Sequence, residues 1–90
     1  MLVWPPKDPD EEISYAIDWS LRLGSDAINT ASFAVSSGDV TVSDSEYDGA
    51  FSQVNVSGGT AGTKAKVLCS ITTEDGQTLQ QTATILIRAR

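Results

Sequence analysis

Short segments of alternating apolar and polar residues, separated by turn-forming residues, constrain this chain more than any other feature. In residues 13–19 the odd positions are large and apolar and the even positions are small or polar, which is the pattern of a strand with one buried side. The odd positions of residues 65–71 repeat it, and residues 79–87 do so with Gln81 as an interruption. Turn signals recur about every 8 to 12 residues, as in a β-sandwich or small barrel.

Six strands are predicted, at residues 13–19, 28–35, 40–42, 51–56, 65–71 and 79–87, and a seventh near residues 3–7. Twenty Ser and Thr residues fit sheets with one solvated side. Two antiparallel sheets packed around Trp19 satisfy this pattern most simply. We therefore predict an all-β, immunoglobulin-like antiparallel sandwich of about seven strands without a disulfide. Ninety residues make one domain, which we place at residues 13–90 behind an extended N-terminal arm at residues 1–12.

Composition excludes several classes of chemistry. The chain has no histidine and one cysteine, which excludes Ser/His/Asp and Cys/His catalysis, imidazole or Cys-rich metal sites and an internal disulfide. A net charge of −6 argues against nucleic acid and anionic membranes as partners. No segment has the length and apolarity of a membrane span or a secretion signal. Ten of the twelve acidic residues but only two of the six basic ones fall in residues 1–48, an asymmetry that can orient identical subunits or dock a partner.

Two groups of acidic residues are candidate sites. Residues 44–49 resemble the start of a calcium loop, but Asn55 stands where the bidentate glutamate belongs, so a solvated turn is the alternative. The acidic residues of 8–12 could act as paired carboxylates, which requires one buried carboxyl with a raised pKa. Solvated acids in a loop are the alternative. We expect no catalytic, cofactor-binding or metal-binding residue.

Two further features have structural interpretations. Cys69 lies on an apolar strand side between Val67 and Ile71 and is predicted to be a buried structural thiol. Residues 58–64 are rich in glycine and end in lysine, but their spacing does not match a phosphate-binding loop and no helix follows. They are predicted to form a turn.

The two tryptophans are interpreted differently. Trp19 is predicted to lie in the core. Trp4 stands among prolines and could anchor a neighbouring subunit, as exposed tryptophans often do. The extended segment around it has no obvious place in the core, so we predict a docking arm, with a frayed terminus as the alternative. Its partner-binding residues would be Trp4, Pro5, Pro6, Asp8, Asp10, Glu11 and Glu12.

Several sequence blocks resemble a known family. They are K-D-P-D-E at residues 7–11, Y-A-I-D-W-S at 15–20, L-G-S-D at 23–26 with Ile28, V-S-G-G-T-A-G-T at 56–63, and I-T-T at 71–73 followed by a hairpin at Gly76. Together they resemble the small fiber-tail adaptor proteins of tailed bacteriophages and prophages. The resemblance spans about residues 7–88.

The resemblance implies a non-enzymatic structural component of the virion, located in the phage tail and assembled in the cytoplasm of the bacterial host. Its partners would be other tail, baseplate or fiber proteins and further copies of itself, with no cofactor, nucleic acid or membrane. The mechanism would be symmetric assembly, in which weak contacts become strong by repetition. Two alternatives remain open. One is an immunoglobulin-like module that binds carbohydrate or protein on a host surface through Tyr47 and Phe51, and the other is a head decoration protein.

Overall fold

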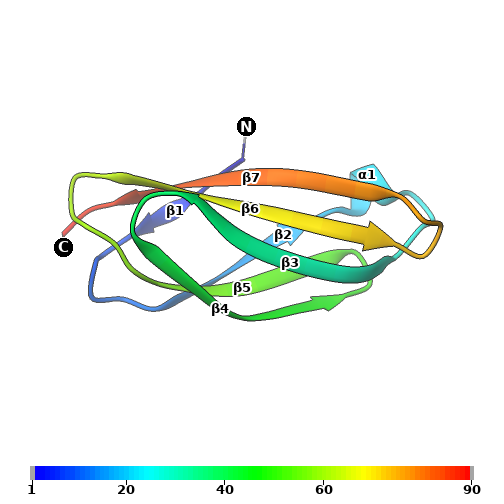
Figure 1. Ribbon diagram of the computed structural model, residues 1–90, viewed down its shortest axis with the longest axis horizontal. Coiled ribbons are helices and arrows are strands. Elements are labelled where there is room, and N and C mark those ends of the chain that lie inside the picture. Colours follow the sequence, from blue (N-terminus) through cyan, green and yellow to red (C-terminus); the bar gives the residue numbers. More distant parts are fainter. Residues whose placement is uncertain (1, 90) are drawn as a thin grey trace.

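The computed structural model describes residues 2–89. Within them the chain forms seven strands and one short helix (Figure 1). In chain order these are β1 (Leu2–Lys7), β2 (Ile13–Asp18), α1 (Ser20–Leu23), β3 (Ile28–Ser37), β4 (Val40–Asp48), β5 (Phe51–Gly58), β6 (Lys64–Thr73) and β7 (Thr78–Ile87).

The strands form two sheets packed face to face. One has four strands in the order β1-β7-β6-β3 and the other three in the order β2-β5-β4. All neighbours are antiparallel except β1 and β7, which are parallel. Seven strands in two layers without a disulfide confirm the predicted sandwich. The first strand pairs with the last, whereas constant-type immunoglobulin domains place the first strand in the opposite sheet.

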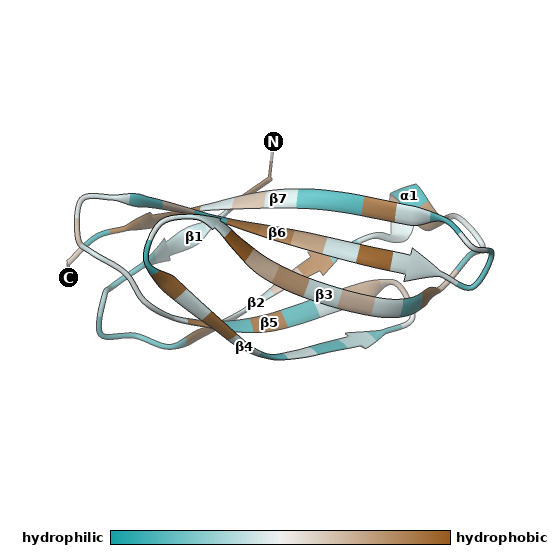
Figure 2. Cartoon of the chain, viewed as in Figure 1, coloured by the Kyte–Doolittle hydropathy of each residue, from teal (hydrophilic) through white to brown (hydrophobic). Residues whose placement is uncertain are grey.

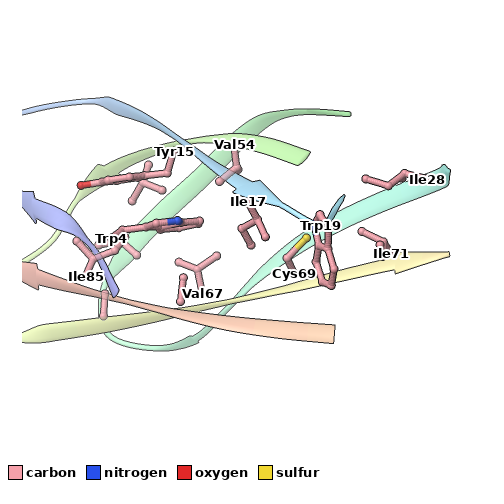
Figure 3. Packing of buried hydrophobic residues seen from close by; sticks show 14 of the residues in the cluster. Trp4, Tyr15, Ile17, Trp19, Ile28, Val54, Val67, Cys69, Ile71 and Ile85 are labelled. Carbon is pink, nitrogen blue, oxygen red and sulfur yellow. The ribbon is translucent and has the colours of Figure 1, made fainter. Parts of the chain in front are cut away.

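The core lies between the inner faces of the two sheets (Figures 2 and 3). The expected alternation is observed on β6, where Ala65, Val67, Cys69 and Ile71 are all at most 1% exposed. On β2, Tyr15 and Ile17 point inward as predicted, and Trp19 follows at 1% exposure. Its indole nitrogen donates a hydrogen bond to Ser52 Oγ at 2.9 Å. This bond removes the cost of burying an unpaired polar atom in the core.

Gly38 makes the sharp crossing from β3 in one sheet to β4 in the other. Its φ of +97° is a conformation that residues with side chains rarely adopt. A Cβ there would lie 2.9 Å from Ala65 Cα. Only glycine therefore allows the turn to pass this close to β6.

Two aromatic side chains close the sides of the sandwich. Trp4 on β1 donates its indole N–H to Ala16 O on β2 at 3.2 Å, and Tyr47 on β4 donates its hydroxyl to Asn29 O on β3 at 2.6 Å. Both acceptors lie on edge strands. Unpaired carbonyls on edge strands invite strand addition by other chains, so these bonds protect the edges as well as join the sheets.

The structure refines the expected strands. β1 confirms the seventh strand expected near residues 3–7, but it belongs to the four-stranded sheet and is not an arm outside the domain. Residues 20–23, which lie between two predicted strands, form a helical turn. The third predicted strand does not stop at residue 42. It continues to Asp48 through an irregularity between Ser43 and Glu46, where Asp44 takes a φ of +54°. A bulge of this kind shifts the alternation without ending the strand, so the pattern along the sequence is interrupted although the strand is not.

Candidate functional site

Trp4, predicted to be an exposed anchor, is buried. It is 4% exposed, and its ring stacks on Tyr15 with the centroids 4.7 Å apart and the planes 4° from parallel (Figure 3). The Tyr15 hydroxyl in turn donates to Pro5 O at 2.7 Å. The prediction of an exposed Trp4 was wrong because pairing of β1 with β7 sets Trp4 beside Ile85 and turns its side chain into the core.

The two prolines after Trp4 fit an edge strand. Proline has no N–H to give to a neighbouring strand, so in sheets it is confined to edges and irregularities. The register of β1 shifts between Trp4 and Lys7, which is where Pro5 and Pro6 stand. Pro5 is exposed and Pro6 half-buried.

Lys7 joins two of the sequence blocks that carry the family resemblance. It is 0% exposed, and its Nζ donates to Asp8 O at 2.7 Å and to Gly58 O, at the end of β5, at 2.6 Å. Backbone carbonyls offset the cost of burying a charge. Its own carbonyl accepts the N–H of Arg88 at 2.9 Å. Reasoning from sequence did not identify this junction, since the irregularity at the prolines hides the inward position of Lys7.

The loop between β1 and β2, residues 8–12, which we call the acidic loop, is held by hydrogen bonds from its own side chains. Glu11 Oε1 accepts the N–H of Asp8 at 2.8 Å, and Asp8 Oδ1 accepts the N–H of Asp10 at 2.9 Å. Asp8 and Glu11 are half-buried, whereas Asp10 and Glu12 are exposed. Of the seven predicted partner-binding residues, only Pro5, Asp10 and Glu12 are therefore exposed.

The glycine-rich loop between β5 and β6 lies beside the acidic loop at the same end of the sandwich (Figure 1). It contacts the end of β7 closely. The N–H of Gly62 donates to Ile87 O at 2.8 Å, and the N–H of Ile87 donates to Thr63 O at 2.9 Å. A Cβ on Gly59 would come within 3.1 Å of the Ile87 side chain. The loop thus closes this end of the sandwich, as expected for a turn, and leads into strand β6 rather than into a helix.

The opposite end of the sandwich is ordered by two carboxylates. Asp18 Oδ1 accepts the N–H of Ser20 at 2.9 Å, and this bond holds the pKa of Asp18 below its usual value. The Thr73 hydroxyl, followed by the N–H groups of Ala27 and Asp75, lowers the pKa of Asp26 despite some desolvation. Both groups stay ionised at neutral pH and organise the chain around α1.

The single thiol of the chain does not have the environment of a nucleophile. Cys69 is buried, its Sγ lies 3.5 Å from Ser52 Oγ, and desolvation raises the pKa of the thiol. A reactive thiol needs a lowered pKa and access to solvent. Within residues 2–89 no three His, Cys, Asp or Glu side chains gather where they could hold a metal ion. Nor does any helix of that stretch have the length and apolarity to cross a bilayer.

The outer faces of the two sheets carry opposite charges. In the register of the three-stranded sheet, Asp18, Phe51 and Asp48 form one row, and Glu46 follows beside Gln53. These five side chains are exposed, and Phe51 is 53% exposed. An exposed aromatic side chain with a polar surround is a common composition of protein–protein contacts.

The four-stranded sheet has only basic residues among its charged ones. Lys64 and Lys66 are exposed on β6, whereas the described parts of β1, β3, β6 and β7 contain no acidic residue. Conversely, β2, β4 and β5 contain no basic residue. The asymmetry seen along the sequence therefore becomes an asymmetry between the two faces of one domain.

Comparison with known proteins identifies one family. None of the curated proteins matches the chain. A protein-family profile described as podophage GP4 fiber-tail adaptor protein gp77 matches residues 7–86, nearly the whole chain. The match covers both loops joined by Lys7 and the strands from β2 to β7, except the last residue of β7, but of β1 it includes only Lys7. The chain therefore belongs to the podophage fiber-tail adaptor family and is a structural protein of the phage tail.

Proposed function

We propose that this protein acts without catalysis, as a rigid spacer that joins other tail or fiber proteins through symmetric, repeated protein–protein contacts. It would assemble into the virion in the cytoplasm of the bacterial host. The observation that carries the proposal is the Lys7 junction, in which a buried ammonium binds Gly58 O and orders the acidic loop beside it. A preformed loop loses little conformational entropy when it binds a partner.

The acidic loop is the surface by which the domain would contact a different virion protein. Pro5, Asp10 and Glu12 are exposed next to the ordered turn, and two exposed carboxylates favour a basic partner surface. This retains the partner-binding role predicted for the segment, without the Trp4 anchor. A single contact of this kind is weak, but symmetric repetition of the contact makes the binding to the partner strong enough for assembly.

The test is quantitative mass spectrometry of purified virions from the source phage or the induced prophage. We expect the chain at a copy number divisible by three or six, cross-linked through the acidic loop to a tail or fiber protein. Cross-links to the capsid would instead indicate a head decoration protein. Absence of the chain from the virions would refute the proposal.

A matched pair of variants tests the loop. Asp10→Lys with Glu12→Lys reverses the exposed charges, whereas Asp10→Asn with Glu12→Gln only removes them. We expect graded loss of incorporation into virions, larger for the reversal. Equal incorporation of both variants and the wild type would exclude the loop as the contact.

The alternative of a host-binding module has less support. Tyr47 and Phe51 do flank a common depression with Glu46, Asp48 and Gln53, but its volume is about 80 Å³. Small-molecule sites usually have volumes of roughly 300 Å³ or more. Both tryptophans are buried, so a sugar titration should be followed by NMR shifts of Phe51 and Tyr47. A saturable shift with one glycan class would revive this alternative.

A further inference from the structure

The acidic and basic surfaces occur on one chain but cannot meet within it. We define the acidic patch as Asp18, Glu46 and Asp48 around Phe51, and the basic patch as Lys64 and Lys66. The acidic patch lies on the outer face of the three-stranded sheet and the basic patch on the outer face of the four-stranded sheet. Each patch therefore faces away from the other, across the core.

The two patches also lie at opposite ends of the long axis. The sandwich measures 41 × 23 × 18 Å. The β4–β5 turn beside Asp48 and Phe51 is at the end that holds α1, whereas β6 begins with Lys64 at the end that holds the glycine-rich loop (Figure 1). A contact between the acidic patch of one copy and the basic patch of another would offset the copies along this axis.

The side chains around the basic patch suit an aromatic residue. Lys64 pairs in register with the half-buried Leu86. Lys66 pairs with Thr84, and Thr84 pairs with Val3, which is 64% exposed. An aromatic ring placed there would cover exposed apolar surface and lie near two ammonium groups, a favourable arrangement for cation–π attraction.

We propose that the acidic patch docks a second copy of this chain through that copy's basic patch, with Phe51 lying against Val3 and Leu86. The proposal rests on the self-assembly included in the proposed function and names its surfaces. The contact is heterologous, because the patches that meet are different and lie on opposite faces. It leaves one free acidic and one free basic patch on every pair, so it continues into a ring or a helical stack.

Salt sensitivity follows from the exposure of the charges. Attraction between exposed groups is screened within about 10 Å at 0.1 M salt. Self-association should therefore be strongest at low salt and should weaken as sodium chloride is added. Phe51→Ser should weaken it at every salt concentration, because the apolar contact does not depend on screening.

The experiment is sedimentation velocity of the purified full chain, over rising concentration at low and high salt. Glu46→Lys with Asp48→Lys reverses the acidic patch and leaves Asp18, which is bonded to Ser20, in place. Lys64→Glu with Lys66→Glu reverses the basic patch. We expect each double variant alone to associate at least about tenfold more weakly than the wild type, since like charges then face each other.

Mixing the two double variants is the decisive measurement. The acidic-patch variant keeps its lysines, and the basic-patch variant keeps its acidic residues, so these two intact patches can bind each other. The two reversed patches are also complementary in charge. Association should return in the mixture toward the wild-type value. Glu74→Lys with Asp75→Lys is the matched control for the acidic-patch variant, since it changes the net charge by the same amount but lies in the exposed turn between β6 and β7, and it should associate like the wild type.

Three results would overturn the proposal. The first is a wild-type chain that stays monomeric at low salt up to about 1 mM, the weak limit of specific contacts. The second is a mixture no stronger than its components, and the third is a control as weak as the patch variants. Urea unfolding of each variant excludes misfolding as the cause. These measurements use the isolated protein, so they test self-docking independently of the proposed function. Self-association can be absent although the chain is found in virions, and it can be present although the chain is absent from virions.

Discussion

Replacement of Trp4 by alanine separates the observed role of the N-terminal segment from the docking arm predicted from sequence. The indole is 4% exposed, stacks on Tyr15 and donates to Ala16 O. A buried aromatic side chain removes about 200 Å² from water, which at ~25 cal/mol per Å² gives an upper limit of about 5 kcal/mol. Because Trp4 lies at the side of the sandwich, where water can enter the space left behind, we expect a loss of about 3 to 4 kcal/mol in the free energy of unfolding.

Urea unfolding followed by far-ultraviolet circular dichroism measures this loss. A 90-residue domain has roughly 5 to 13 kcal/mol of stability, so most of the Trp4→Ala protein should stay folded in water with a much lower midpoint. Its melting temperature should fall by about 12 °C or more. Trp4→Phe keeps a stacked ring but loses the bond to Ala16 O, and should cost about 1 to 2 kcal/mol.

Val3→Ala is the matched control. Val3 is the neighbouring residue of the same strand but is 64% exposed, so its loss should change stability by no more than about 0.5 kcal/mol. If Trp4→Ala unfolded at the same urea concentration as Val3→Ala, β1 would not contribute to the fold. The segment would then be an arm, as the sequence suggested.

Three further predictions concern the loops and the core. Gly59→Ala should destabilise the domain by about 1 to 3 kcal/mol in urea unfolding, because φ is +104° and the new Cβ would contact Ile87. Gly62→Ala has nothing within 4 Å of its Cβ and should cost no more than about 1 kcal/mol. Equal losses of stability in the two variants would refute the steric argument. The pKa of Asp26 is lowered in the folded state, so its contribution to stability is present above pH 3.8 and is lost as pH falls through the folded pKa. In Asp26→Asn the free energy of unfolding should fall less steeply below pH 4 than in the wild type. An unchanged pH profile would contradict this. Cys69, buried and with a raised pKa, should react with a thiol reagent at neutral pH only after unfolding, and rapid labelling of the native chain would refute its burial.

The sequence predicted best those elements whose pattern is local and regular. On β6 and most of β7 the period-2 alternation predicted the inward side chains, because both strands are central and pair along most of their length. Gln81 interrupts this pattern and is half-buried, with Nε2 donating to Thr82 O at 3.2 Å. It lies beyond the part of β7 that β1 covers, since β1 begins opposite Ala83. The irregular residue therefore lies outside the stretch of β7 that the described residues of β1 cover.

The sequence failed where an irregularity or a distant partner decides the structure. Trp4 is inward only because β1 joins β7, some eighty residues away in the chain, and the prolines beside it resembled a linker. The charges of residues 44–48 resembled a loop because a bulge at Ser43 to Glu46 breaks the alternation. The acidic loop itself was predicted as a loop, but the hydrogen bonds that order it depend on side-chain geometry that spacing does not give.

The sequence blocks that carry the family resemblance can be compared with the surfaces proposed for self-docking. Those blocks contain Lys7, Tyr15, Trp19, Asp26 and the glycine-rich loop, all of which bind other parts of the same chain. They define the scaffold. Glu46, Asp48, Phe51, Lys64 and Lys66 lie outside the blocks and contribute their exposed side chains to the two faces. Of the two patches, only Asp18 lies within a block, and the charge reversals at Glu46, Asp48, Lys64 and Lys66 leave it in place. Those reversals should therefore change assembly without changing the fold that the blocks define.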